Sequence, residues 1–334
     1  MKRRKRFRKP FLLFGFIALC GVSLFVAQGV GQGRYALSDS LALFYPEGLS
    51  PSERTILFAI RLPRVVLALL VGGGLALSGT VLQGLFQNPL VDPYILGVSS
   101  GAAFGAVVAI LTRVYFGLFT VPLFAFLSAL GTAVLVFRLA RVGRRIPLET
   151  LLLAGLAVGF FFSALITLGM FLSGENLHQV VFWTMGGFWN RGWEEVKMVL
   201  PFFAFAVPFL LSFGRELNAF LLGEKAAESL GVDVERFKRW VLSVVSLLVA
   251  SCVATSGVIG FVGLVVPHIL RLLGFQDHRV LLPLSLCAGG AVLLLADTLA
   301  RSIIHPVELP VGVVTSLLGA PFFVYLLRQR KRGL

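Results

Sequence analysis

The chain has 334 residues, of which 57% are hydrophobic and only 14% are charged, and its formal net charge is +14. Because an ordinary soluble domain carries about 25% charged residues, this composition excludes an ordinary soluble protein. Apolar runs of roughly 18 residues or more, long enough to cross a bilayer as helices, recur along the chain. The alternating ten-residue strands of a membrane barrel do not occur in the sequence.

The sequence therefore predicts an all-α, polytopic membrane protein with ten transmembrane helices. We place the spans near 11–30, 64–83, 94–112, 118–138, 148–171, 195–213, 240–256, 258–275, 280–300 and 310–327. They form a single transmembrane domain, 11–328, between a basic tail at 1–10 and a short tail at 329–334. A secretory signal peptide has the same basic start and apolar run, but nine further spans favour an uncleaved first helix.

Basic residues are distributed unevenly between the loops. They cluster at 2–9, 138–145, 215–239, 271–279 and 328–332, which alternate with poorer loops. This is the positive-inside pattern, and it predicts that both termini are cytoplasmic. We expect the clusters to attract anionic membrane lipid rather than nucleic acid.

The loop after the second span, 87–93, contains two prolines that flank polar side chains. Each proline lacks an N–H and disfavours helix in the residue before it, so a fixed turn is expected. Asn88 and Asp92 could cap the next helix, and a gate at the inner mouth is the alternative. The small residues of 96–102, among them Ser99 and Ser100, permit close packing between helices. Alternatively, they line a transport pathway to which the cargo binds only weakly.

Arg61, Arg64 and Arg301 are outward exceptions to the positive-inside pattern. Arg301 follows Asp297 by four residues, so the two side chains could form an ion pair within one helix. Alternatively, the three arginines bind carboxylates of an extracytoplasmic partner, because arginine suits bidentate contacts with carboxylates.

One compact polar segment, 222–231, lies on the predicted cytoplasmic side between two spans. It reads Leu-Gly-Glu-Lys-Ala-Ala-Glu-Ser-Leu-Gly, so it is charged and helix-prone in an otherwise apolar chain. The chain contains no phosphate-binding Gly-x-x-x-x-Gly-Lys-Ser/Thr loop and no metal-binding spacing of His or Cys. We therefore expect no enzyme activity, cofactor or metal in this chain, and a partner that docks on the segment.

A faint internal repeat is also visible. Arg61-Leu-Pro-Arg64 opens the second span and Arg236-Phe-Lys-Arg239 opens the seventh, and a Ser-Gly pair precedes a proline by a similar interval in both halves. These two spans run in opposite directions, so the repeat is inverted, as in many transporters. Chance similarity between glycine-rich membrane helices is the alternative.

Many motifs in one order now resemble the permease family of type II ABC importers for iron-siderophores, haem and vitamin B12. The resemblance covers about 55–328 and rests on Arg61-Leu-Pro-Arg64, Ser78-Gly79, Asn88-Pro89-Leu90, Leu96-Gly-Val-Ser-Ser-Gly-Ala102, Leu152-Leu-Ala-Gly155, Trp183-Thr-Met-Gly-Gly187, Leu222-Gly-Glu224 with Ala227 and Leu230-Gly231, Gly260-Phe-Val-Gly-Leu-Val-Val-Pro-His268, Ala296-Asp297 with Ala300-Arg301, Glu308-Leu-Pro-Val-Gly-Val-Val-Thr315 and Gly319-Ala-Pro321.

The resemblance implies ten spans per subunit and a homodimer in the bacterial cytoplasmic membrane, with the pathway at the dimer axis. It implies two cytoplasmic ATPase subunits, which bind ATP and Mg, and a periplasmic or lipid-anchored binding protein. Coupling helices near 215–235 would place five residues in the ATPase cleft: Gly223, Glu224, Ala227, Leu230 and Gly231. Arg61, Arg64 and Arg301 match arginines that dock the binding protein. Matching span positions suggest that the pathway is bordered by Gly155, Gly159, Ser163, Thr315 and Ser316.

These features predict an alternating-access importer for a metal chelate, either a ferric siderophore or haem. Vitamin B12 is the alternative cargo, because 182–188 looks similar to the B12 branch whereas 190–193 looks more like siderophore permeases. The alternative from another class is a secondary transporter driven by an ion gradient, and an exporter or metal-ion permease of similar architecture is a third.

Overall fold

The computed structural model describes residues 50–114, 117, 119–143, 145–304 and 307–331. The predicted tail at 1–10 and first span at 11–30 lie outside these residues, as do the last three residues of the predicted tail at 329–334. Within the described part of the chain the regular elements are all helical, and the one β-bridge, between Val142 and Arg145, is isolated.

The elements in chain order are α2 (Pro51–Thr55), the π-helix η3 (Ile56–Arg61), α3 (Leu62–Leu85), η4 (Pro93–Leu96), α4 (Val98–Thr112), α5 (Thr120–Ala140), α6 (Leu148–Leu172), η5 (Gly174–Asn176), α7 (Leu177–Met185), α8 (Trp193–Ser212), α9 (Gly214–Phe220), α10 (Glu224–Ser229), α11 (Val234–Ser256), α12 (Val262–Leu272), α13 (His278–Ser302) and α14 (Val311–Lys331).

Every predicted span from the second to the tenth coincides with a helix, which confirms the all-α polytopic fold. Six helices of the described residues are long and apolar enough to cross a membrane, and α4, α12 and the Val311–Val324 part of α14 are shorter apolar stretches. The seventh span begins earlier than predicted, at Val234, because the Asp233 side chain accepts a hydrogen bond from the Arg236 N–H and caps α11.

The centre of the bundle is α3, which packs most extensively against α13 and also contacts α11 and α12. Glycine allows this contact to be close. A Cβ atom on Gly72 of α3 would overlap the carbonyl oxygen of Gly289 on α13, and one on Gly79 would overlap that of Gly263 in the first turn of α12. Small residues at such positions let membrane helices approach backbone to backbone.

Two helices are too short to cross a bilayer, and their starting points meet. Helix α12 has 11 residues and α4 has 15, or about 16 and 22 Å of helix. The Tyr94 hydroxyl in η4 donates to the Ile259 carbonyl (2.8 Å) and accepts from the Ile259 N–H (3.2 Å) before α12. Irregular backbone at membrane depth needs such partners. Paired short helices agree with an inverted repeat, which stays a prediction.

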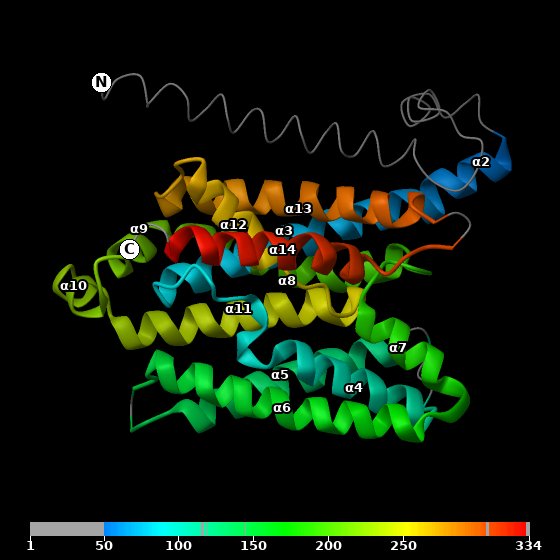
Figure 1. The fold of residues 1–334 in the computed structure, drawn as a ribbon, viewed down its shortest axis with the longest axis horizontal. Coiled ribbons are helices and arrows are strands. Elements are labelled where there is room, and N and C mark those ends of the chain that lie inside the picture. Colours follow the sequence, from blue (N-terminus) through cyan, green and yellow to red (C-terminus); the bar gives the residue numbers. More distant parts are fainter. Residues whose placement is uncertain (1–49, 115–116, 118, 144, 305–306, 332–334) are drawn as a thin grey trace.

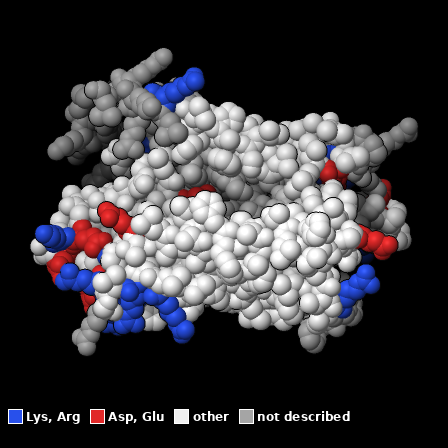
Figure 2. Space-filling model, turned by 60° about the horizontal axis from the view of Figure 1, so that its bottom comes forward, with Lys and Arg blue, Asp and Glu red and all other residues white. Residues whose placement is uncertain are grey.

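The bundle is elongated, with the long helices running along one axis (Figure 1). Helices α9 and α10 lie at one end, and α2 and α7 lie at the other. Figure 2 shows charged side chains gathered at both ends and a broad uncharged belt between them. This is the surface that a bilayer requires of a spanning protein.

Candidate functional site

The polar segment singled out by the sequence forms a helix between two glycine turns at one end of the bundle. Gly223 has φ +104° and Gly231 has φ +88°, conformations that suit glycine and set the direction of the chain on either side of α10. Leu222 and Leu230 are 71% and 65% exposed beside these turns. Large apolar side chains exposed at a charged end are typical of a protein-docking surface.

The five residues predicted to meet an ATPase all lie on this element: Gly223, Glu224, Ala227, Leu230 and Gly231. They do not all face outward. Ala227 is fully buried against the bundle, so its place is in the packing that holds α10. Leu230 and Gly231 are exposed.

A buried lysine connects α10 to the rest of the protein. The Lys238 ammonium in α11, only 2% exposed, donates to the Glu224 carboxylate (2.7 Å) and to Glu235 (3.3 Å). It also lies 3.5 Å from the Ile146 carbonyl oxygen, while the Ile146 N–H donates to Glu235 Oε2 (3.0 Å). The network therefore joins α10 to the start of α11 and to the chain that enters α6.

Helix α9 is held separately to the start of α13. Asn218 donates from its side-chain nitrogen to Asp277 Oδ1 (2.8 Å) and accepts from the His278 N–H (2.9 Å). The α9–α10 element is thus tied to two membrane-spanning helices. Sequence reasoning missed Lys238 and Asn218, because basic and polar residues in a loop predicted to be cytoplasmic indicated only the orientation of the chain.

The predicted arginines gather at the opposite end, where they surround a carboxylate. Asp297 is fully buried and receives Arg64 Nη2 at 2.8 Å and Arg301 Nε at 3.2 Å. Arg64 also donates from Nη1 to Glu308 (2.9 Å), and Arg61 is buried nearby. The ion pair between Asp297 and Arg301 within one helix is confirmed. Docking of a binding protein by these arginines stays a prediction.

The loop between α3 and α4 is a fixed turn. Asn88 Oδ1 accepts from the Leu90 N–H (3.0 Å), and Asp92 Oδ1 accepts from the Tyr94 N–H (2.9 Å). Asp92 therefore caps η4 as expected, whereas Asn88 closes the turn rather than capping a helix. The gate interpretation of Asn88 stays a prediction.

Of the candidate pathway residues on α4 and α6, some serve in packing and others are open. A Cβ atom on Gly155 would overlap the Ile95 carbonyl oxygen, so this glycine permits α6 to pack against η4. Gly159 has space, with Ser100 Oγ 3.9 Å from where a Cβ would lie. Ser99 and Ser100 are half-buried in the first turn of α4, and Ser163 is exposed.

The second group of pathway candidates lies on α14. Thr315 is buried and donates to the Gly312 carbonyl oxygen (3.1 Å), and Ser316 is half-buried. Figure 1 places α6 and α14 on opposite sides of α11, so the two groups do not meet within one chain. Both helices carry exposed apolar side chains, such as Phe160 (67%) and Leu317 (68%). Lipid or a second copy of the chain can cover them.

A solved structure and many known proteins resemble this chain in fold or in sequence. Residues 18–329 match the FecCD transport family. The chain belongs to this family. Among its relatives, the uncharacterized ABC transporter permease protein YvrB of Bacillus subtilis is 43% identical over 99% of this chain and 96% of its own length. The cobalamin import system permease protein BtuC of Halobacterium salinarum is 46% identical over 89% of this chain and 79% of its own.

A solved structure described as an inward-facing conformation of a metal-chelate type ABC transporter superposes with a TM-score of 0.85. It shares 38% sequence identity and covers 96% of this chain and 99% of its own. Family members are permeases of ABC importers that work with separate ATPases and substrate-binding proteins, so the ABC importer class replaces the alternative driven by an ion gradient. Other relatives, 35 to 39% identical, are named for hemin, ferric citrate, iron hydroxamate and molybdate.

Proposed function

We propose that this permease forms a homodimer in the bacterial cytoplasmic membrane, with both termini in the cytoplasm, and imports a metal chelate. The cargo is a ferric siderophore or haem delivered by an extracytoplasmic binding protein. ATP and Mg are bound by two partner ATPase subunits. The observation that carries the proposal is the α9–α10 element, which offers exposed Leu222 and Leu230 to a partner and is anchored to two spans.

The anchors suggest how the partner's motion reaches the membrane. An ATPase that moves α10 pulls on Glu224, which is paired with Lys238 at the start of α11. The same lysine network holds the chain before α6 through Ile146. Helix α6 carries Gly159 and Ser163, so closing the ATPase dimer would shift one wall of the proposed pathway and alternate its access. The pathway would then run between the α6 and α14 faces of two copies.

The proposed homodimer is supported by the poor cover of α6. Along this helix Leu153 and Phe160 are both 67% exposed and Phe171 is 84% exposed. Some of these side chains face lipid, and the side of α6 nearest Gly159 suits a second copy. Cross-linking of cysteines placed at Ser163 would test the dimer. A wholly monomeric product in native membranes would contradict it.

Cobalamin is the second candidate cargo, because one relative at 46% identity is named for cobalamin import. The decisive experiment is uptake of labelled ferric siderophores, haem and cobalamin by proteoliposomes containing the permease, its ATPase and its binding protein. We expect ATP-dependent uptake of an iron chelate that an uncoupler does not abolish. Uptake of cobalamin alone would replace the proposed cargo, and uptake without the ATPase would overturn the mechanism.

A further inference from the structure

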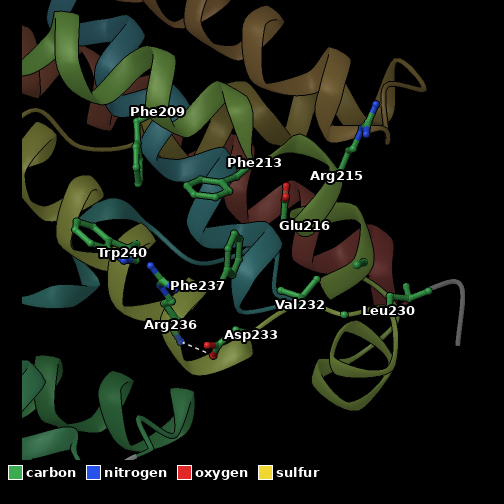
Figure 3. Close-up of a pocket in the computed structure, with 12 residues that line it drawn as sticks. Phe209, Phe213, Arg215, Glu216, Leu230, Val232, Asp233, Arg236, Phe237 and Trp240 are labelled. Atoms are coloured by element: carbon green, nitrogen blue, oxygen red, sulfur yellow. Dashed lines mark hydrogen bonds between the residues drawn. The ribbon is translucent and has the colours of Figure 1, made fainter.

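A cavity of about 740 Å³ opens at the α10 end of the bundle, between α8, α9 and the start of α11, and Leu230 and Gly231 of the proposed ATPase contact form its outer edge (Figure 3). Its walls are aromatic. Phe213 lies 4.9 Å from Phe209 and 5.1 Å from Phe237, centroid to centroid, and Trp240 lies 6.1 Å from Phe209. Small-molecule sites occupy about 300–1,000 Å³ and have such linings.

The cavity faces the membrane as well as the aqueous end. Phe209 and Trp240 belong to the spanning helices α8 and α11, and Trp240 lies six residues into α11, about 9 Å along its axis. Trp240 is 51% exposed, and Phe205, one turn before Phe209, is 53% exposed. Aromatic rings at this depth are typical of the headgroup level of a bilayer.

The rim carries both signs of charge. Arg215 and Arg236 are exposed cations, and Glu216 and Asp233 are the anions beside them. Among the described residues, the Arg236 guanidinium makes no hydrogen bond or ion pair, although its backbone N–H donates to Asp233 (3.1 Å). The Oε2 atom of Glu216 is buried, and it accepts no hydrogen bond from any of the described residues. A buried acceptor without a donor is costly, so a donor is expected.

We propose that this cavity binds the headgroup of one phosphatidylethanolamine molecule. Arg236 contacts the phosphate, and the ammonium, which has three N–H donors, enters beside Glu216. The acyl chains leave between Phe209 and Trp240 toward the lipid phase. The charged side chains directed toward the cavity, Arg236 with Glu216 and Asp233, are of both signs and suit a zwitterion, whereas a purely anionic headgroup would meet the two carboxylates unfavourably.

Native mass spectrometry of the purified permease, titrated with defined phospholipids, tests the proposal without ATP, ATPase or cargo. We expect phosphatidylethanolamine to bind at least tenfold more tightly than phosphatidylcholine, whose ammonium has no N–H. Arg236→Gln should weaken binding of all phospholipids by about tenfold, and Glu216→Gln should remove the preference for ethanolamine. Arg239→Gln is the matched control, because Arg239 lies on the same helix outside the cavity.

Three results would overturn the site. The first is equal binding of phospholipids with ethanolamine, choline and glycerol headgroups. The second is a preference for the anionic glycerol headgroup. The third is unchanged lipid binding in both Arg236→Gln and Glu216→Gln. If those variants retain lipid but bind the ATPase subunit more weakly, the cavity is a protein contact instead. Trp240→Ala, monitored by thermal melting, separates loss of lipid from loss of fold. Because no transport step is measured, failure of the cargo proposal leaves the lipid result unaffected.

Discussion

Replacing Lys238 by methionine tests whether the buried lysine network transmits force. Methionine keeps most of the apolar stem and removes the ammonium, which lies 2.7 Å from Glu224 and 3.3 Å from Glu235. The lysine side chain is 2% exposed, but the two carboxylates are 41% and 26% exposed and regain water when the cation is lost. A hydrogen bond to a charged group contributes about 1.5–3 kcal/mol. Because the carboxylates are partly exposed, we expect a loss of about 2 kcal/mol for the network, in the lower half of that range.

The loss falls on the link between α10 and the spans rather than on the docking surface. Leu222 and Leu230 remain exposed, so the ATPase should still bind and hydrolyse ATP. A change of about 2 kcal/mol corresponds to about 30-fold in an equilibrium constant. We therefore expect Lys238→Met to reduce cargo imported per ATP hydrolysed by about 10- to 30-fold, while ATP hydrolysis stays within about twofold of the wild-type rate.

Proteoliposomes containing the full complex allow both rates to be measured in one sample. Lys225→Met is the matched control, because Lys225 is exposed on α10. Its substitution removes the same charge but leaves the contacts of Lys238 in place. Lys238→Arg restores a cation and should recover part of the coupling. An unchanged ratio of import to hydrolysis in Lys238→Met, or an equal drop in Lys225→Met, would refute the role of the network.

Three further predictions concern stability and docking. Arg64→Met should lower the free energy of unfolding by about 3–5 kcal/mol, because it leaves the carboxylate of Asp297 buried beside one cation fewer; a thermal melting midpoint in detergent equal to the wild type would contradict this. Gly79→Ala should destabilise by about 1–3 kcal/mol, since its Cβ overlaps the Gly263 carbonyl oxygen in α12, whereas Gly131→Ala in helix α5, whose Cβ meets nothing, should not lower the midpoint of the same melt. Leu230→Glu should change stability by less than about 0.5 kcal/mol because the side chain is 65% exposed, yet reduce co-purification of the ATPase; full recovery of the complex would remove Leu230 from the docking surface.

Local chemistry made most of the helices predictable. A long apolar run must be helical in lipid whatever surrounds it, so the spans from α3 to α14 follow from composition. The short helix within 222–231 and the ion pair of Asp297 with Arg301 could also be predicted, because both depend on near neighbours in sequence. Helix α7 was not predicted, since Leu177–Met185 is too short to be recognised as a span.

The tertiary structure alone decided which polar groups far apart in the sequence meet. Arg64 and Asp297 are 233 residues apart, and Tyr94 and Ile259 are 165 apart, so no local pattern connects either pair. In a low-dielectric interior each buried polar group needs a specific partner, and only the packing of distant helices supplies it. The sequence thus determined that the chain spans a membrane as helices and carries a charged, helix-prone segment between two spans, which the charge distribution predicts to be cytoplasmic. The fold determined that Lys238 ties this element to α11 and to the start of α6.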